Sequence, residues 1–338
     1  MRDTHHHRRR SRLPAGGRAV VVAMLAVLLA ACGQAAGTSD AAGVTSPSAA
    51  RDPADTLFAY DADAPIELTD VGTLEENGYE IRDVTYASPL SGDVPAYIAE
   101  PTEDPAGVGI IMTPGIPEKR HSYADPISRF ACAGATAIVV DAPWARTEDR
   151  GGDTALSFTP QDHDEQIQLV VDLRRAIDVL EDMGAERIGF DAMSYGAGIG
   201  AILAGVEDRI DAFALLSGGV GPIRRFVSED GTALYPLTFK SRAEQRVWIE
   251  AMEPIEPEHF VGEATAPILF VAGREDTIIT PDEVELIHEA AGDGAEVRWY
   301  DAGHDLSPEA FMEHLDWLAE QVGLDQDRID ECFPADSF

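Results

Sequence analysis

From about Tyr79 onward, short β-branched runs alternate with amphipathic stretches. This alternation is typical of a mostly parallel sheet covered by helices on both faces. The predicted strands are Tyr79 to Tyr86, Val94 to Ala99, Val108 to Met112, Thr136 to Val140, Arg187 to Phe190, Ala212 to Leu216, Ile268 to Ala272 and Val297 to Tyr300. A Ser-Gly-Asp turn at 91–93 makes the first two an antiparallel lead-in hairpin. We therefore expect an α/β fold with an eight-stranded, mostly parallel sheet.

The clearest helix covers Ile167 to Leu180, where apolar residues recur at steps of three and four and form one stripe. Further helices are expected at Tyr123 to Gly134, Tyr195 to Gly205, Arg242 to Ala251, Pro281 to Ala291 and Pro308 to Gln321. Between Gly218 and Pro267 the alternation breaks, and four prolines appear within this segment. We expect a small cap insertion there, at about 219–262, and a solvated acidic tail at the C-terminus.

The N-terminal residues have the pattern of an export signal. Six arginines precede an uncharged apolar run from Ala19 to Ala31. The run is shorter than the roughly 20 apolar residues that a membrane helix needs. It ends in Leu-Ala-Ala-Cys at 29–32, which resembles the lipobox of bacterial lipoproteins, so residues 1–31 are predicted to be a lipoprotein signal peptide. The alternatives are a plain secretory signal or a short anchor with an incidental cysteine.

Cys32 would then become the lipidated first residue of the mature chain and hold it at the outer, extracytoplasmic face of the cell membrane. Residues 32–53 are rich in Gly, Ala, Ser, Thr and Pro, a composition that predicts a flexible tether. The folded domain is expected to span 54–338.

Charge and cysteine content exclude several classes of protein. With 25 basic against 61 acidic residues, the formal net charge is −36, which opposes binding to nucleic acid. Three cysteines are too few for a disulfide framework or a thiolate zinc cluster. Cys132 and Cys332 could pair in an oxidising compartment, or Cys132 could be a small buried hydrophobe. The sequence has no metal-binding motif, phosphate-binding loop or dinucleotide fingerprint, so no metal and no cofactor are expected.

The predicted strand at 187–190 runs into Ala192-Met193-Ser194-Tyr195-Gly196 and a helix of small residues. This segment resembles the nucleophile elbow of the α/β-hydrolase family, G-x-S-x-G, with Ala192 in place of the first glycine. Very small residues are needed on both sides of the serine because the tight turn presses the backbone against its neighbours, and alanine can meet that need. A serine in this position could also be only a helix N-cap.

Two later loops carry the other residues that the resemblance requires. Asp276 follows the predicted strand at 268–272, where the family places its acid, and Glu275 is the nearest rival. His304 follows the strand at 297–300 in a Gly-His loop, like the family's catalytic histidine. The order Ser, Asp, His distinguishes this fold from other folds with the same triad.

The resemblance implies a role for each residue. Ser194 is the nucleophile, His304 takes its proton, and Asp276 fixes the tautomer of the imidazole and stabilises its positive charge. The oxyanion would be bound by the backbone N–H of Tyr195 and by an N–H in the loop at 113–117, where Ile116 is the predicted donor. Many relatives have His-Gly in that loop, which this sequence lacks.

The lead-in residues 94–101 resemble the dienelactone-hydrolase and esterase branch of the family, although members of that branch often have a cysteine nucleophile. We therefore predict a serine hydrolase that cleaves a carboxylic ester, lactone or thioester of a small substrate through an acyl-enzyme. The alternatives are a peptidase on short peptides and an inactive, ligand-binding lipoprotein of the same fold. Trp144 is predicted to contact substrate, and the aromatic residues of the cap either line the pocket or form the cap's own core. The cationic residues of the cap, Arg225 among them, either bind a substrate carboxylate or neutralise neighbouring acids.

Overall fold

The computed structural model describes residues 56–146, 156–228, 231 and 239–334, all of which belong to one compact unit, residues 49–338. The predicted signal peptide, Cys32 and the tether lie outside the described residues. In the ranges described, no helix combines the length and apolar character needed to cross a bilayer.

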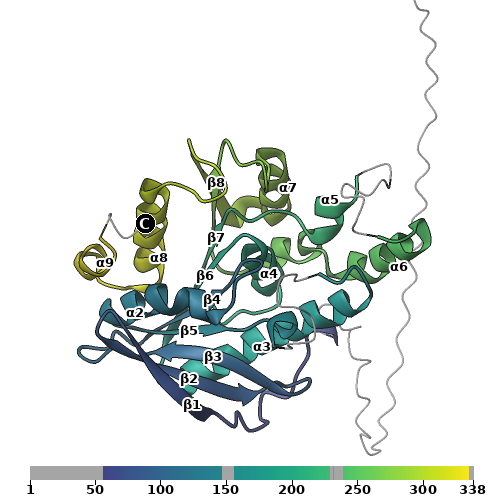
Figure 1. The fold of residues 1–338 in the computed structure, drawn as a ribbon. Helices are drawn as coiled ribbons and strands as arrows, with labels where there is room; N and C mark the ends of the chain where they lie inside the picture. The colour runs from purple at the N-terminus through teal and green to yellow at the C-terminus, as the bar shows by residue number, and fades with distance from the viewer. Residues whose placement is uncertain (1–55, 147–155, 229–230, 232–238, 335–338) are drawn as a thin grey trace, which may run out of the picture. The chain divides into compact units, whose positions relative to one another are not determined.

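One sheet of nine strands organises the molecule, in the order β1-β2-β3-β5-β4-β6-β7-β8-β9 (Figure 1). The strands are β1 (Thr69–Glu76), β2 (Tyr79–Ala87), β3 (Asp93–Ala99), β4 (Val108–Thr113), β5 (Ala135–Val140), β6 (Arg187–Met193), β7 (Ala212–Leu216), β8 (Ile268–Gly273) and β9 (Ala295–Tyr300). The pairs β1–β2, β2–β3 and β3–β5 are antiparallel. The pairs β5–β4, β4–β6, β6–β7, β7–β8 and β8–β9 are parallel. The predicted fold class and the lead-in hairpin are confirmed.

The predicted number of eight strands was one too low. The additional strand, β1, pairs only with β2 at the edge of the sheet, and its first five residues are exposed. An edge strand with no buried face needs no alternation of apolar and polar residues, because its pairing depends on backbone hydrogen bonds. The sequence TDVGTLEE therefore carried no strand signal.

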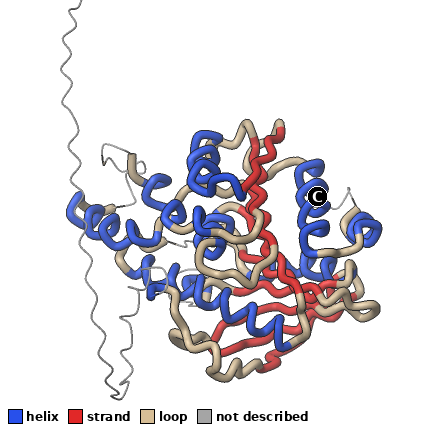
Figure 2. The backbone as a smooth tube through the Cα atoms, turned by 180° about the vertical axis from the view of Figure 1, so that it is seen from behind, coloured by secondary structure: helices blue, strands red, loops and turns tan. Residues whose placement is uncertain are grey.

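Helices cover both faces of the sheet, as the view from behind in Figure 2 shows. One face carries α3 (Gln161–Asp182), α4 (Tyr195–Ala204) and α7 (Pro281–Ala291). The other carries α2 (Ala124–Cys132), α8 (Pro308–Val322) and α9 (Gln326–Cys332). A separate apolar core lies on each face. Because the central strands β4 and β7 are buried along their whole length, they read as continuous apolar runs in the sequence.

The segment between β7 and β8 forms the predicted cap. It contains α5 (Pro222–Phe226), α6 (Arg242–Met252) and three short 3₁₀ turns, at Glu253–Ile255, Pro257–His259 and Val261–Glu263. The indole N–H of Trp248, a fully buried residue of α6, donates a hydrogen bond of 2.8 Å to Asp162 in the first turn of α3. The rings of Phe158 and Phe239 pack on the same indole. Trp248 and Phe239 therefore pack the cap against Phe158 and the first turn of α3.

The C-terminus corrects another expectation. Instead of a solvated tail, residues 326–332 form α9, and Ile329, Cys332 and the following Phe333 are buried. Cys132 and Cys332 form a disulfide with a Cα–Cα distance of 5.8 Å, which joins α2 to α9 across 200 residues of sequence. Phe130 packs edge-on against Phe333 beside it. The acidic composition concealed the helix because its few apolar residues all face the protein.

Candidate active site

Ser194 lies in a strained turn between β6 and α4. Its backbone angles, φ 57° and ψ −121°, fall in a region that L-residues rarely occupy, as the predicted elbow requires. Gly196 is needed because a Cβ atom there would come within 2.3 Å of the carbonyl oxygen of Thr113. Ala192 is buried and lies opposite Thr113 in the register of β6 and β4. Small residues on both sides of the serine therefore let the turn pack against the end of β4.

His304 connects Ser194 to Asp276. Its Nε2 lies 3.0 Å from the serine Oγ, and its Nδ1 lies 2.8 Å from Oδ2 of Asp276. The three residues come from the loops that follow β6, β8 and β9, which belong to the parallel part of the sheet and have their carboxyl ends at the same edge. The structure thus brings together the three side chains that the sequence singled out.

Both oxygens of the Asp276 carboxylate have hydrogen-bond partners. Oδ1 accepts hydrogen bonds from the backbone N–H groups of Ile278 and Ile279, at 2.7 and 2.9 Å, while Oδ2 faces the imidazole. The side chain is 2% exposed. The rival acid Glu275 is exposed, so it lacks the burial that orients Asp276. This arrangement fixes the imidazole with Nδ1–H toward the carboxylate and a free Nε2 toward the serine.

A further residue that the sequence did not single out positions His304. The hydroxyl of Ser217, directly after β7, donates a hydrogen bond of 2.8 Å to the backbone carbonyl of His304. Ser217 is 1% exposed. Its only sequence signal is its place immediately after a buried strand, because a serine there belongs to no motif.

The loop after β4 lies against the elbow. A Cβ atom on Gly115 would be 3.3 Å from the Cβ of Ser194. Tyr195 is the first residue of α4, where backbone N–H groups lack partners within the helix. Ile116 and Tyr195 both line the pocket beside Ser194. The predicted oxyanion donors therefore flank the serine from two elements.

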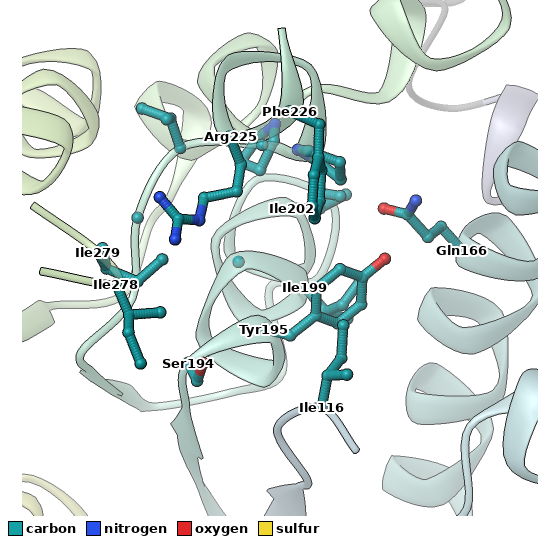
Figure 3. A pocket seen from close by; sticks show the side chains of 16 residues that line it. Ile116, Gln166, Ser194, Tyr195, Ile199, Ile202, Arg225, Phe226, Ile278 and Ile279 are labelled. Atoms are coloured by element: carbon teal, nitrogen blue, oxygen red, sulfur yellow. The ribbon is translucent and has the colours of Figure 1, made fainter. Parts of the chain in front are cut away.

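A pocket of about 260 Å³ opens beside Ser194 (Figure 3). Its walls are mostly apolar and come from α4, the cap and the loop after β8; they include Ile199, Ile202, Val220, Phe226, Pro257 and Ile279. Polar side chains reach it at two places: Arg225 of the cap on one side and Gln166 of α3 on the other. The phenol of Tyr195 is buried without a hydrogen-bond partner among the described residues. Burial raises the pKa of Tyr195 well above its usual value, so the phenol stays neutral.

Trp144 is not among the residues that line this pocket. It is 8% exposed, and its ring packs edge-on against Tyr195 with 5.4 Å between the centroids. It therefore supports the pocket wall from behind. Among the aromatic residues of the cap, Phe226 lines the pocket, and Tyr235 lies outside the described residues.

Within the described part of the chain, no group of three or more His, Cys, Asp or Glu side chains is placed to hold a metal ion. What the arrangement can do chemically follows from its hydrogen bonds. A serine oxygen next to the free nitrogen of an oriented imidazole can be deprotonated as it attacks a carbonyl carbon.

No family model matches the sequence, and no curated protein is significantly similar to it. Solved structures are similar at low identity. An acetyl xylan esterase from a Thermoanaerobacterium species superposes with a TM-score of 0.65 and 14% identity, over 79% of this chain and 92% of that one. An acetyl xylan esterase from a Paenibacillus species gives 0.61 and 17%, over 79% and 92%. A protein described as a dienelactone hydrolase from Klebsiella pneumoniae gives 0.53 and 18%, over 72% and 98%.

The chain has the α/β-hydrolase fold. Superposition over most of both chains, together with the mostly parallel sheet, establishes this. At these identities, the likeness concerns the fold and not the substrate.

Proposed function

We propose that this protein is a serine hydrolase that cleaves carboxylic esters of small substrates through an acyl-enzyme. The observation that carries the proposal is His304, whose two ring nitrogens lie within hydrogen-bonding distance of Ser194 Oγ and Asp276 Oδ2. The esterases among the structural neighbours support the same class of reaction.

In the first half of the proposed reaction, His304 Nε2 takes the proton of Ser194 as Oγ attacks the ester carbonyl. The negative oxygen of the tetrahedral intermediate is bound by the N–H groups of Tyr195 and Ile116. His304 then gives the proton to the departing alcohol, and the acyl group remains on Ser194. In the second half, His304 takes a proton from a water molecule, whose oxygen attacks the carbonyl carbon of the acyl-enzyme. His304 then returns the proton to Ser194 Oγ as the bond between Oγ and the acyl carbon breaks, which releases the carboxylic acid and restores the free serine.

Steady-state hydrolysis of p-nitrophenyl acetate tests this proposal. Ser194→Ala removes the nucleophile and should lower kcat by at least about 10³-fold. The variant should unfold at the same temperature as the wild type, because alanine keeps the Cβ atom that packs on Gly115. Unchanged hydrolysis in this variant would contradict the proposal.

Two alternatives are separate outcomes of the same experiment. Faster cleavage of short peptide p-nitroanilides than of esters would favour a peptidase. A folded wild-type protein that hydrolyses neither class would indicate a hydrolase fold that serves only to bind a ligand.

We also propose that the mature chain is attached through lipid on Cys32 to the outer face of the cell membrane. The sequence at 29–32 supports this, and the disulfide between Cys132 and Cys332 suits an oxidising compartment outside the cytoplasm. In the producing bacterium, Cys32→Ala should move the protein out of the membrane fraction. Equal membrane association of both proteins would contradict the anchor.

A further inference from the structure

Arg225 differs from the other arginines of this acidic protein. Within the described ranges, every other arginine side chain forms an ion pair with a carboxylate or donates a hydrogen bond to a backbone carbonyl. The guanidinium of Arg225 does neither with any described residue, and only its backbone N–H is bonded, to Gly221. In a chain with 61 acidic residues and 25 basic ones, an arginine that has no carboxylate partner among the described residues is unexpected.

The position of Arg225 indicates where its partner would come from. The residue lies on α5 and is partly buried, and its side chain extends into the pocket that contains Ser194 (Figure 3). The adjacent Arg224 is more exposed, does not line that pocket, and pairs with Glu258 at 3.3 Å. Two neighbouring arginines on one short helix thus differ in surroundings: Arg224 is neutralised by the protein, and Arg225 faces the substrate pocket.

A buried carboxyl of the cap, that of Glu256, does not supply a counter-charge to Arg225. Glu256 borders a second cavity, which Arg225 also touches, and its Oε1 accepts the backbone N–H of Ile223 at 3.2 Å. Burial, followed by the charge of Glu258, raises the pKa of Glu256 to about 8. At neutral pH this carboxyl is therefore mostly protonated and contributes little negative charge near the guanidinium.

We propose that Arg225 binds a carboxylate on the substrate, so that the preferred substrates are esters that carry a free carboxylate separated from the reacting carbonyl by a short apolar spacer. This inference rests on the proposed esterase function. The apolar wall suits the spacer, and the planar guanidinium can bind a carboxylate through two parallel hydrogen bonds. A phosphate dianion suits the pocket less well, because Arg225 is the one cationic side chain among its described lining residues.

Because the protein as a whole is negatively charged, Arg225 would attract an anionic substrate only at short range. A net charge of −36 repels anions at long range, but at ordinary salt concentrations this repulsion is screened beyond about 10 Å. A guanidinium inside an apolar pocket is screened less than a surface charge and acts only on a substrate that has entered. The preference should therefore depend on Arg225 itself and not on the protein's net charge.

The carboxylate could belong to the acyl group or to the alcohol, and two pairs of substrates distinguish these cases. The acyl pair is 4-nitrophenyl hydrogen adipate and its neutral methyl ester. The alcohol pair is 4-acetoxybenzoate and its neutral methyl ester. Within each pair the molecules differ by one negative charge and a methyl group, so the ratio of their kcat/KM values reports recognition of the charge.

The test compares these ratios in the wild type, Arg225→Gln, Arg225→Lys and the matched control Arg224→Gln. In at least one pair, the wild type should prefer the anion and Arg225→Gln should lower the ratio about 10- to 100-fold, as expected for a hydrogen-bonded charge pair. Arg225→Lys should retain part of the preference, and Arg224→Gln should keep the ratio within about twofold. Ratios that change by less than twofold in Arg225→Gln for both pairs would overturn the proposal.

Calorimetric titration with the free acids adipate and 4-hydroxybenzoate separates this inference from the proposed function. Binding that is lost in Arg225→Gln and kept in Arg224→Gln supports the carboxylate site even if no ester is hydrolysed. Hydrolysis of the neutral esters combined with no difference between the two variants would sustain the esterase and reject the carboxylate site.

Discussion

The carboxyl edge of the sheet and the cap contribute to the same pocket in different ways. At the sheet edge, the polar groups of Asp276 and His304 have hydrogen-bond partners within the protein. On the cap side, the guanidinium of Arg225 has no partner among the described residues. At the sheet edge, the protein itself therefore orients the Asp276 and His304 side chains, whereas on the cap side the Arg225 guanidinium is available to a ligand. Under the two proposals made above, the sheet edge determines the type of reaction and the cap determines the preference for substrate.

The largest effect is expected from a substitution that disturbs the hydrogen bonds among Ser194, His304 and Asp276 at the sheet edge. Asp276→Asn keeps the shape and the acceptor for Ile278 and Ile279, but it would present an NH₂ group to His304 and favour the wrong tautomer. We expect kcat for p-nitrophenyl acetate to fall about 10³-fold with little change in KM. The matched control is Glu275→Gln, because Glu275 is the exposed neighbour. A larger loss in the control than in Asp276→Asn would show that the acid had been assigned to the wrong residue.

The free energy of unfolding should depend on pH through a buried carboxyl of the cap. Because burial raises the pKa of Glu256 to about 8, from an ordinary value near 4.5, its neutral form stabilises the folded state. That stabilisation is complete below pH 4.5 and is lost progressively as pH rises to about 8, by up to about 1.4 kcal/mol per unit. Glu256→Gln keeps an acceptor for Ile223 and cannot ionise.

Urea unfolding should therefore give equal free energies of unfolding for Glu256→Gln and wild type near pH 4.5, and a growing advantage for the variant up to pH 8. Glu263→Gln, on an exposed residue of the cap, should show no such trend. A constant difference between Glu256→Gln and wild type across this range would mean that the Glu256 carboxyl ionises as easily in the folded protein as in the unfolded chain.

The smallest effect concerns the residue that supports the histidine loop. Ser217→Ala removes the hydrogen bond to the carbonyl of His304 and leaves the triad atoms unchanged. A lost hydrogen bond of this kind is worth about 1 kcal/mol, so kcat should fall about 3- to 10-fold while KM changes little. If KM rose and kcat did not change, Ser217 would be acting on the pocket and not on His304.

Sequence patterns predicted the parts of the molecule whose structure is specified by nearby residues, such as buried strands and the turn at Ser194. The strands β4 to β8 are mostly buried and β9 is partly buried, so the apolar residues of these strands could be recognised in the sequence. The predicted bounds of β7 and α7 agree with the structure. The elbow was predictable because its geometry admits few residues around Ser194. Asp276 and His304 could be predicted because their loops follow those strands directly.

Other features depend on contacts that no local pattern records. The strand β1 and the helix α9 are polar segments stabilised by a neighbour, in the second case through the disulfide to Cys132. Trp144 was expected in the pocket, but Tyr195 lies in front of it. The sequence left open whether Arg225 is neutralised by a neighbouring acid, and it gave no sign of the hydrogen bond of Ser217, because each depends on which groups are near in space.

The most direct test of the account is to treat the soluble domain, expressed from about Thr38, with a fluorophosphonate probe and to map the modified residue by mass spectrometry. The proposed mechanism predicts one modified residue, Ser194, and no labelling of Ser194→Ala or of protein unfolded in urea. Labelling should also fall sharply in Asp276→Asn, because attack on phosphorus needs the same oriented imidazole. No labelling of the folded wild-type protein, or equal labelling of Ser194→Ala, would contradict the claim that Ser194 is an activated nucleophile.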